Sequence, residues 1–437
     1  MSAPKSLSLI INRIKKRSIP VKISRFIIKI GCPGKLSAFL KIKQLLYLLI
    51  NKFENSYFIA IEGLPYCLMP DASNHMTNFK KNKATNSDNR KCLNCKFVED
   101  CPGWPKNPGT DNNLSPSPAR NLPEEIVLEI TQKCNQDCRI CFSRNKTNEL
   151  SINKIEKIIN SCCELGIKTV RFTGGEPLFY KDIATALNYA KEKKLYVILN
   201  TNATVFNEKI KKTLTNRVDN ILISLQGFNK LSEYNLTKSK VDFEKKIMNI
   251  IEFNRLIPTV RVGTIISKTL LNNFFHYYYL LRRIGIKNWE IYRPMTNNND
   301  GEFKLSKNDL LIAMNYIKEI KKSGVNLKIA NPVPFCLTSD YELSSHVLLG
   351  AESDDGHRRM IFDAGGFFKP SYFINKNLGR DIESAWNNPF LKKIRSLSFL
   401  PKQCRECFYL KWCKGGSRYW AKIANQDYFS PDPLMYK

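Results

Sequence analysis

The stretch IVLEITQKCNQDCRIC, residues Ile126–Cys141, joins a run rich in β-branched residues to three closely spaced cysteines. Its first part, Ile126–Thr131, predicts a buried strand. Cys134, Cys138 and Cys141 follow with the spacing C-x3-C-x2-C. Three thiolates on one short loop can hold three irons of a cubane cluster and leave the fourth iron open to an exogenous ligand.

Strands and helices alternate downstream of this loop. A helix is predicted over Ile152–Gly166, ended by its glycine, and another over Lys181–Lys194. The strands predicted after the first are Thr169–Phe172, Leu195–Asn200, Asn220–Leu225, Thr259–Ile266 and Asn288–Pro294. Six strand–helix units in a row predict an α/β fold with a parallel sheet, curled or open, and ligands at the C-terminal ends of its strands.

Polar and glycine residues follow several of these strands. The second predicted strand is followed by TGGEP. Gly174 and Gly175 would let the backbone approach a bound molecule, and the Glu176 carboxylate would be a fixed acceptor for a cationic group. Asn202 follows the third strand and Ser224 stands in the fourth. Both residue types also form local hydrogen bonds at strand ends, and this alternative stays open for them.

The C-x3-C-x2-C loop after strand one and GGEP after strand two together resemble the radical S-adenosylmethionine (SAM) superfamily, over residues 124–325. The resemblance implies a partial (β/α)6 TIM-like barrel and a 4Fe–4S cluster on the three cysteines. In that family one electron from the cluster cleaves SAM to methionine and a 5′-deoxyadenosyl radical. Ile140 departs from the aromatic residue usual before the third cysteine.

The family's SAM contacts map onto the residues after strands two to four. By resemblance, Gly174, Gly175 and Glu176 receive the SAM amino group, whereas Ser224 and Asn202 match positions near the SAM ribose or carboxylate. We expect no catalytic residue beyond the cluster and the SAM site.

The tail from Arg358 onward resembles the cysteine-rich SPASM domain or its shortened form, twitch, which carries auxiliary iron–sulfur clusters. Ser371 and Ser417 stand where that family places two cysteines of its first auxiliary cluster, which implies that this cluster is absent. The ligands that remain for the other cluster are Cys404, Cys407 and Cys413, with Cys336 as the replacement for a missing fourth ligand.

The same cysteine pattern occurs near the N-terminus. LPYCL at Leu64–Leu68 resembles VPFCL at Val333–Leu337, and each is followed by C-x2-C-x5-C. The N-terminal quartet is Cys67, Cys92, Cys95 and Cys101. We interpret the two quartets as two auxiliary 4Fe–4S sites that flank the barrel. Tetrahedral zinc uses the same ligands and remains the alternative.

These features divide the 437 residues into four parts. They are a basic N-terminal extension with its quartet (1–106), a linker rich in Pro, Ser and Asn (107–123), the barrel (124–325) and the SPASM/twitch-like tail (326–437). The net charge is +30, and residues 1–61 hold twelve Lys or Arg but one acid, Glu54. Such a surface favours acidic partners, or it reflects a general lysine bias.

Cysteine use and hydropathy suggest the compartment. Eleven of fourteen cysteines fall into the three clusters, and without a secretion signal this favours metal ligation in the cytoplasm. Cys32, Cys162 and Cys163 are interpreted as structural. No apolar run is long enough for a transmembrane helix, and Leu36–Ile50 predicts an amphipathic helix packed on the protein.

Other polar candidates are few. Arg293 could meet a substrate carboxylate or form a structural ion pair. The aromatic stretch Asn273–Gly285 has helical spacing and predicts core packing. None of the four histidines has a partner at a useful spacing, so we expect no histidine ligand.

The leading hypothesis is a radical SAM oxidoreductase or maturase that modifies a peptide or protein side chain, served by a one-electron donor such as ferredoxin or flavodoxin. One alternative is a radical SAM enzyme that modifies RNA, motivated by the basic charge although no RNA-binding motif is recognised. The other is a non-catalytic iron–sulfur scaffold, against which the intact SAM motifs argue.

Overall fold

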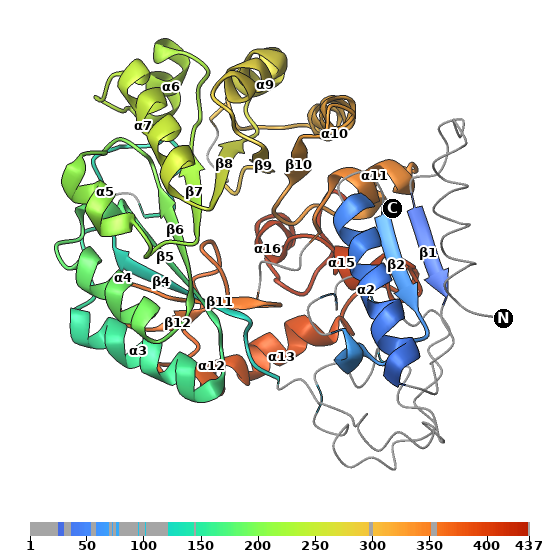
Figure 1. Cartoon of the computed structure of the whole chain (residues 1–437). Helices are drawn as coiled ribbons and strands as arrows, with labels where there is room; N and C mark the ends of the chain where they lie inside the picture. Colours follow the sequence, from blue (N-terminus) through green and yellow to red (C-terminus); the bar gives the residue numbers. More distant parts are fainter. Residues whose placement is uncertain are drawn as a thin grey trace.

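The protein is described by a computed structural model (Figure 1). The described residues are 25–29, 36–53, 58–69, 72, 76–77, 95, 101, 121–143, 146–296, 300–350 and 356–435. Cys32, Cys92 and most of the predicted linker lie outside them.

The centre of the molecule is a nine-stranded sheet with the order β10-β9-β8-β7-β6-β5-β4-β11-β12. All neighbouring strands pair in parallel except β11 and β12. The six predicted strands are all present, as β4 (Glu125–Thr131), β5 (Thr169–Gly174), β6 (Tyr196–Thr201), β7 (Asn220–Ser224), β8 (Thr259–Ile265) and β9 (Asn288–Tyr292). Among the described strands the sheet stays open, and the predicted parallel α/β fold is confirmed.

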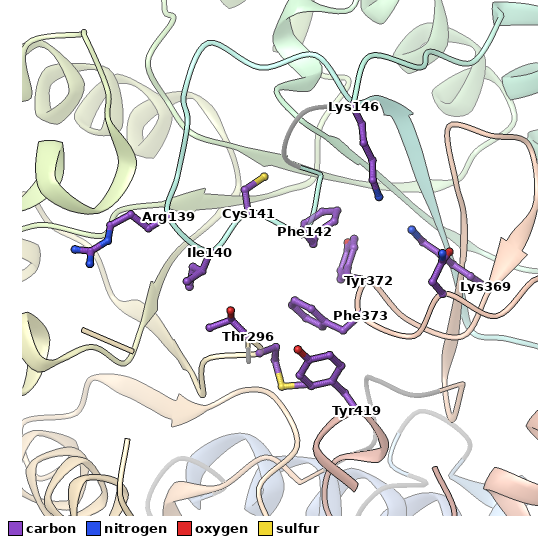
Figure 2. Close-up of a pocket in the computed structure, with 12 residues that line it drawn as sticks. Arg139, Ile140, Cys141, Phe142, Lys146, Thr296, Lys369, Tyr372, Phe373 and Tyr419 are labelled. Carbon is purple, nitrogen blue, oxygen red and sulfur yellow. The ribbon is translucent and has the colours of Figure 1, made fainter. Parts of the chain in front are cut away.

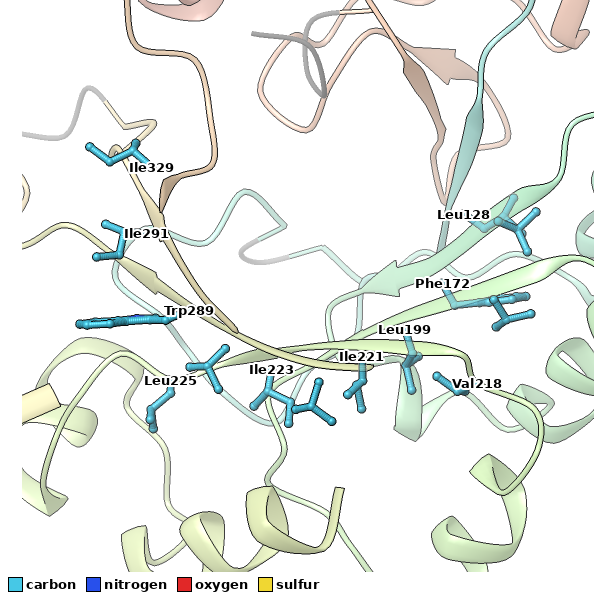
Figure 3. Close-up of a cluster of buried hydrophobic side chains, with 14 of the residues drawn as sticks. Leu128, Phe172, Leu199, Val218, Ile221, Ile223, Leu225, Trp289, Ile291 and Ile329 are labelled. Atoms are coloured by element: carbon cyan, nitrogen blue, oxygen red, sulfur yellow. The ribbon is translucent and has the colours of Figure 1, made fainter. Parts of the chain in front are cut away.

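Helices cover the outer face of the sheet (Figure 1). They are α3 (Ile152–Leu165), α4 (Ile183–Glu192), α5 (Glu208–Leu214), α6 (Lys230–Thr237), α7 (Phe243–Leu256), α8 (Lys268–Asn272), α9 (Phe274–Arg283) and α10 (Lys307–Lys321). Side chains alternate along each strand, and Figure 3 shows the apolar set, including Leu128, Phe172 and Ile221, on the helix-covered face. Burial of this face provides the main hydrophobic stabilisation of the domain.

The opposite face of the sheet carries paired charges. Arg171 on β5 pairs with Glu125 on β4 at 2.6 Å, and Arg261 on β8 pairs with Glu290 on β9 at 2.6 Å. Burial alone would raise the pKa of Glu125, but Arg171 and Arg359 outweigh it and lower this pKa to about 2. Charges that are paired in this way let the inner face of an open barrel stay polar without leaving an unpaired buried charge.

The tail contributes to both edges of the sheet. Strand β10 (Asn326–Ile329) extends the β9 edge, and β11 (Arg359–Phe362) with β12 (Phe368–Lys369) extends the β4 edge. The predicted boundary at residue 325 therefore falls inside a continuous sheet, and the division into domains stays a prediction. The other tail elements are η5 (Phe335–Leu337), α11 (Tyr341–Val347), α12 (Ile382–Trp386), α13 (Pro389–Ser396), α14 (Lys402–Arg405), α15 (Leu410–Cys413) and α16 (Arg418–Asn425).

A small N-terminal unit packs beside the tail (Figure 1). It has a parallel sheet of β1 (Arg25–Lys29), β2 (Phe58–Glu62) and β3 (Met76–Thr77), with α2 (Leu36–Phe53) and η1 (Tyr66–Leu68). Leu46 and Ile50 of α2 are buried against β2, so the predicted amphipathic helix packs on the protein. No helix among the described residues is long and apolar enough to cross a bilayer.

Two further predictions concern packing. Phe274, Tyr277 and Tyr278 of α9 are buried in the main core, as the aromatic spacing predicted. Cys162 of α3 is fully buried in the same core, and Gly166 ends that helix in the left-handed conformation with φ of 78°. Both results follow from helical periodicity and glycine's tolerance of positive φ.

Candidate active site

The loop that carries Cys134, Cys138 and Cys141 leaves β4 at the C-terminal edge of the sheet. Two of its backbone N–H groups, at Asp137 and Arg139, donate to the last carbonyls of α6 at 3.2 and 3.1 Å. The Arg139 guanidinium also donates to Asp300 at 2.7 Å. These contacts hold the cysteine loop against the barrel from two sides.

The three thiols lie close enough to act on one another electrostatically. Burial, together with negative charge on Cys141 and Cys134, raises the pKa of Cys138 to about 12. Burial also raises the pKa of Cys134, with Glu176 and Cys141 adding to the effect. Without a cation nearby, such closely spaced thiols stay protonated. The positive charge of bound iron would instead favour the thiolate form, which is the form that ligates a cluster. The donor set therefore fits a cluster.

Gly174 and Gly175 allow the backbone at the end of β5 to approach the backbone at the end of β4 closely. A Cβ on Gly174 would lie 2.0 Å from the Thr131 carbonyl oxygen, and one on Gly175 would lie 2.2 Å from that of Lys133. These carbonyls accept from the Gly175 and Glu176 N–H groups at 2.7 and 2.9 Å. The glycines thus bring the GGEP segment against the chain that leads into Cys134, and this packing explains them without a bound molecule.

The Glu176 carboxylate is directed into the protein. It is fully buried and accepts from the Leu178 N–H at 3.0 Å, the Thr201 hydroxyl at 2.8 Å and the Asn202 N–H at 2.7 Å. Burial raises its pKa, although these three donors oppose the rise. The carboxylate therefore joins the GGEP segment to the end of β6, and the contact of this segment with the SAM amino group stays a prediction.

The two strand-end candidates both lie at the C-terminal edge of the sheet. Asn202 is buried, and its side-chain amide lies between Cys134 and Thr204. Ser224 is partly buried, and its hydroxyl accepts from the Gln226 amide at 2.8 Å. The structure thus brings Asn202 to the cysteine loop but gives Ser224 a local partner, and its contact with SAM stays a prediction.

The tail quartet is brought together across 78 residues of chain. Cys336 lies in η5, Cys404 in α14 and Cys413 at the end of α15. Burial, together with negative charge on Cys336 and Cys407, raises the pKa of Cys404 to about 11 and that of Cys413 to about 12. Charge on Cys336 thus acts on all three thiols of the C-x2-C-x5-C run, which places Cys336 near them, and the four-cysteine ligand set stays a prediction.

The N-terminal quartet is described only in part. Cys92 and the Cys67 side chain lie outside the described residues, whereas Cys95 and Cys101 are partly buried. The Tyr66 N–H donates to Cys101 Sγ at 3.4 Å, and the Phe335 N–H donates to Cys413 Sγ at 3.4 Å. The aromatic residue before the first cysteine thus contacts the last cysteine in both quartets, and the sequence repeat has a structural counterpart. No group of three potential ligands in the described ranges is preassembled around one metal ion.

Several other sequence candidates have structural roles. Arg293 forms a buried ion pair with Asp432 at 2.8 Å, so its structural interpretation is the one observed. His276 stacks on Phe228 with ring centroids 5.5 Å apart. Burial lowers the pKa of His346 to about 4 and keeps that of His357 well below its usual range.

A cavity of about 310 Å³ adjoins the cysteine loop. The loop side supplies Arg139, Ile140, Cys141, Phe142 and Lys146; Met295 and Thr296 follow β9; and the tail supplies Lys369, Tyr372, Phe373, Asn375 and Tyr419. Figure 2 shows the aromatic rings of Phe142, Tyr372, Phe373 and Tyr419 gathered along one side of this cavity. Gly174, Gly175, Glu176, Asn202 and Ser224 do not line it. The cavity therefore lies apart from the predicted SAM residues.

Sequence reasoning missed these aromatic lining residues. The only sequence signal was the pair Tyr372-Phe373, which follows β12 within the SPASM-like stretch. Tyr372 packs on Phe142 at a centroid distance of 4.8 Å, and Phe373 packs on Tyr419 at 5.7 Å. Contacts between segments so distant in sequence leave no periodic pattern from which they could be predicted.

Comparison with known proteins identifies the central domain. Residues 128–270 match the family described as the radical SAM superfamily. The chain contains a radical SAM domain. Such a domain implies a 4Fe–4S cluster and SAM, which agrees with the donor set at Cys134, Cys138 and Cys141.

Relatives of the radical SAM domain differ in the activities that their names give. The AdoMet-dependent heme synthase of Methanosarcina barkeri is 22% identical, covering 72% of this chain and 96% of its own. Streptococcus suis SuiB bound to precursor peptide SuiA has a similar fold, with a TM-score of 0.59, 20% identity, and 73% of this chain and 77% of that chain covered. The anSMEcpe enzyme with bound AdoMet and the Cp18Cys peptide gives a TM-score of 0.57 and 16% identity over 70% of this chain and 93% of that chain.

Proposed function

We propose that the chain is a radical SAM enzyme that modifies a side chain of a peptide or protein. The cavity beside Cys141 carries this proposal, because the barrel supplies one wall of the cavity and the tail supplies the other. A substrate held there would contact the cysteine loop and the tail together. The solved structures of SuiB and anSMEcpe, which share the fold, hold peptides.

The residues around the cysteine loop have two proposed functions. Cys134, Cys138 and Cys141 would hold the cluster, which when bound supplies the electron that cleaves SAM. The Gly174–Glu176 segment, Asn202 and Ser224 lie at the strand ends and would hold SAM. Because the Glu176 carboxylate already accepts three internal donors, we assign its contribution to the shape of the segment.

The cavity lining indicates the kind of residue that it receives. The rings of Phe142, Phe373 and Tyr419 offer aromatic faces for an apolar or aromatic side chain. Arg139 lies on one side of the cavity and Lys146 with Lys369 on the other (Figure 2). Two of the three cations in the lining are already paired, Arg139 with Asp300 and Lys369 with Glu129 at 3.6 Å, so Lys146 is the cation that favours an acidic group next to the reacting side chain.

A second candidate is the modification of a tetrapyrrole. The heme synthase of Methanosarcina barkeri matches over nearly its whole length, and Lys146 of the cavity would also suit a porphyrin carboxylate. The two candidates share the catalytic cluster and differ only in what the cavity binds.

Production of 5′-deoxyadenosine from SAM tests the shared chemistry. Protein reconstituted and reduced without oxygen should form it, and Cys138→Ala should abolish it, because two thiolates cannot hold the cluster. Formation at the wild-type rate by the triple variant of Cys134, Cys138 and Cys141 would overturn the assignment. Stimulation by a peptide encoded beside the gene, but not by an iron porphyrin, would support the peptide substrate; the reverse result would support the tetrapyrrole.

A further inference from the structure

We propose that Asn202 sets the reduction potential of the catalytic cluster by donating a hydrogen bond to the sulfur of Cys134. This inference rests on the proposed function, since it concerns the cluster on Cys134, Cys138 and Cys141. The Asn202 Nδ2 atom lies 3.8 Å from Cys134 Sγ, within the range for a hydrogen bond to sulfur. Asn202 is only 7% exposed, so water competes little for this donor.

The orientation of the Asn202 amide is fixed by its partners. Its Oδ1 atom accepts from the Thr204 N–H at 3.0 Å and from the Thr204 hydroxyl at 2.6 Å. The Nδ2 atom therefore faces the opposite way, toward Cys134, and its second N–H donates to Asn135 Oδ1 at 2.9 Å. A flipped amide would place an oxygen against Asn135 Oδ1 and an N–H donor against the Thr204 N–H.

Glu176 holds the Asn202 backbone in the position that this contact needs. Its Oε2 atom accepts from the Asn202 N–H at 2.7 Å, and its Oε1 atom accepts from the Thr201 hydroxyl at 2.8 Å. The same hydroxyl accepts from the Ala203 N–H at 3.1 Å. A continuous set of hydrogen bonds thus runs from the GGEP carboxylate through the end of β6 to a predicted cluster ligand. Asn202 is a positioning and tuning residue in this scheme and need not touch substrate.

The direction of the effect follows from electrostatics. Reduction adds one electron, supplied by an external one-electron donor, and increases the negative charge on the cluster and its cysteine sulfurs. A donor aimed at one of these sulfurs stabilises the reduced state more than the oxidised state. Loss of the donor should therefore shift the midpoint potential to a more negative value and make the cluster harder to reduce.

The test uses Asn202→Leu and Asn202→Asp, each of which removes the N–H donor. Asn249→Leu is the matched control, because Asn249 donates to the Ala203 carbonyl at 3.0 Å and so supports the same segment without contacting sulfur. Each full-length protein is reconstituted without oxygen, and its clusters are titrated under electron paramagnetic resonance. The catalytic signal is identified as the one that changes when SAM is added to the wild type and that Cys138→Ala lacks. Midpoint potentials are then measured without SAM, because Asn202 is itself a predicted SAM contact.

We expect a more negative midpoint potential for the SAM-responsive signal in both Asn202 variants and the wild-type value in Asn249→Leu. A wild-type potential in either Asn202 variant, with a normal SAM-responsive signal, would overturn the inference and leave the proposed function intact. An equal shift in Asn249→Leu would also overturn it, because the effect would then come from the position of the segment. Absence of any SAM-responsive signal in the wild type would instead refute the proposed function.

Discussion

The ammonium group of Lys411 lies over the ring of Tyr66, 4.4 Å from the ring centroid. Lys411 stands between Cys407 and Cys413 of the tail quartet, and Tyr66 directly precedes Cys67 of the N-terminal quartet. Lys411 also donates to the Tyr66 hydroxyl at 3.2 Å and to the Met76 carbonyl. The segments that carry the two quartets are therefore in direct contact, and the N-terminal unit docks on the tail.

Replacement of Lys411 by alanine should loosen this contact. The cation–π interaction and the two hydrogen bonds together stabilise the docked state by about 1–2 kcal/mol, which corresponds to roughly tenfold faster opening. Hydrogen exchange measured peptide by peptide should show faster exchange over residues 58–69 and no change in β4–β9. Lys402→Ala, an exposed change in α14, is the control. Unchanged exchange over residues 58–69 in Lys411→Ala would show that other contacts hold the unit in place.

The serines that occupy the family's first auxiliary site should be dispensable for iron. Ser417 caps α16 by accepting from the Trp420 N–H at 3.2 Å, and Ser371 accepts from the Ile374 N–H at 3.2 Å. Ser417→Ala should therefore cost about 1 kcal/mol of stability through the lost helix cap. The double variant with Ser371→Ala should keep the wild-type iron content after reconstitution. Loss of several irons per chain would show that these positions still support a cluster.

Elemental analysis decides between iron–sulfur and zinc at the two quartets. Three 4Fe–4S sites would give about twelve irons per chain, and Cys95→Ala or Cys407→Ala should each remove about four. SAM cleavage driven by a strong chemical reductant should survive in both variants, because neither quartet supplies a predicted SAM contact. About eight irons with one zinc that is lost in Cys95→Ala would assign zinc to the N-terminal quartet. Four irons with two zincs would exclude both auxiliary clusters.

Lys321 should make the folded protein more stable at higher pH. Burial, together with the positive charge of Lys328, lowers the pKa of Lys321 to about 7. Its Nζ atom has no hydrogen-bond partner among the described residues. The unfolded chain would keep this proton up to about pH 10, so between pH 7 and pH 10 it binds more protons than the folded chain and stability rises with pH.

The variant Lys321→Met should remove this pH dependence. At pH 7 it should raise the free energy of unfolding by on the order of 1–2 kcal/mol, because a buried cation gives way to an apolar chain of similar shape. Thermal unfolding of the wild type and the variant, measured from pH 6 to pH 9, provides the check. Parallel curves for the two proteins would mean that Lys321 titrates normally. Lys322→Met, an exposed neighbour on the same turn, is the matched control.

Local sequence was sufficient for the elements and for the cysteine loop. The apolar and β-branched run before Cys134 predicted β4, and glycine spacing predicted the end of α3 at Gly166, because both depend on backbone preferences of neighbouring residues. The three-cysteine spacing likewise predicted a cluster loop, since ligands on one short segment need no distant partner. Strands β10 and β11 escaped prediction because they are short, and β11 in addition joins the sheet through β4, which is distant in sequence.

The amino-acid sequence by itself determined that this protein builds a parallel sheet with a radical SAM cysteine loop and two similar cysteine quartets. Only the tertiary structure decided what surrounds them. Three features depend on contacts between segments that lie tens to hundreds of residues apart in the sequence. They are the hydrogen bonds that orient the Glu176 carboxylate, the contact of Asn202 with Cys134, and the aromatic wall from Tyr372 to Tyr419. The physical reason is that such contacts depend on how the strand ends and the tail come together in three dimensions, which nearest-neighbour preferences along the chain do not specify.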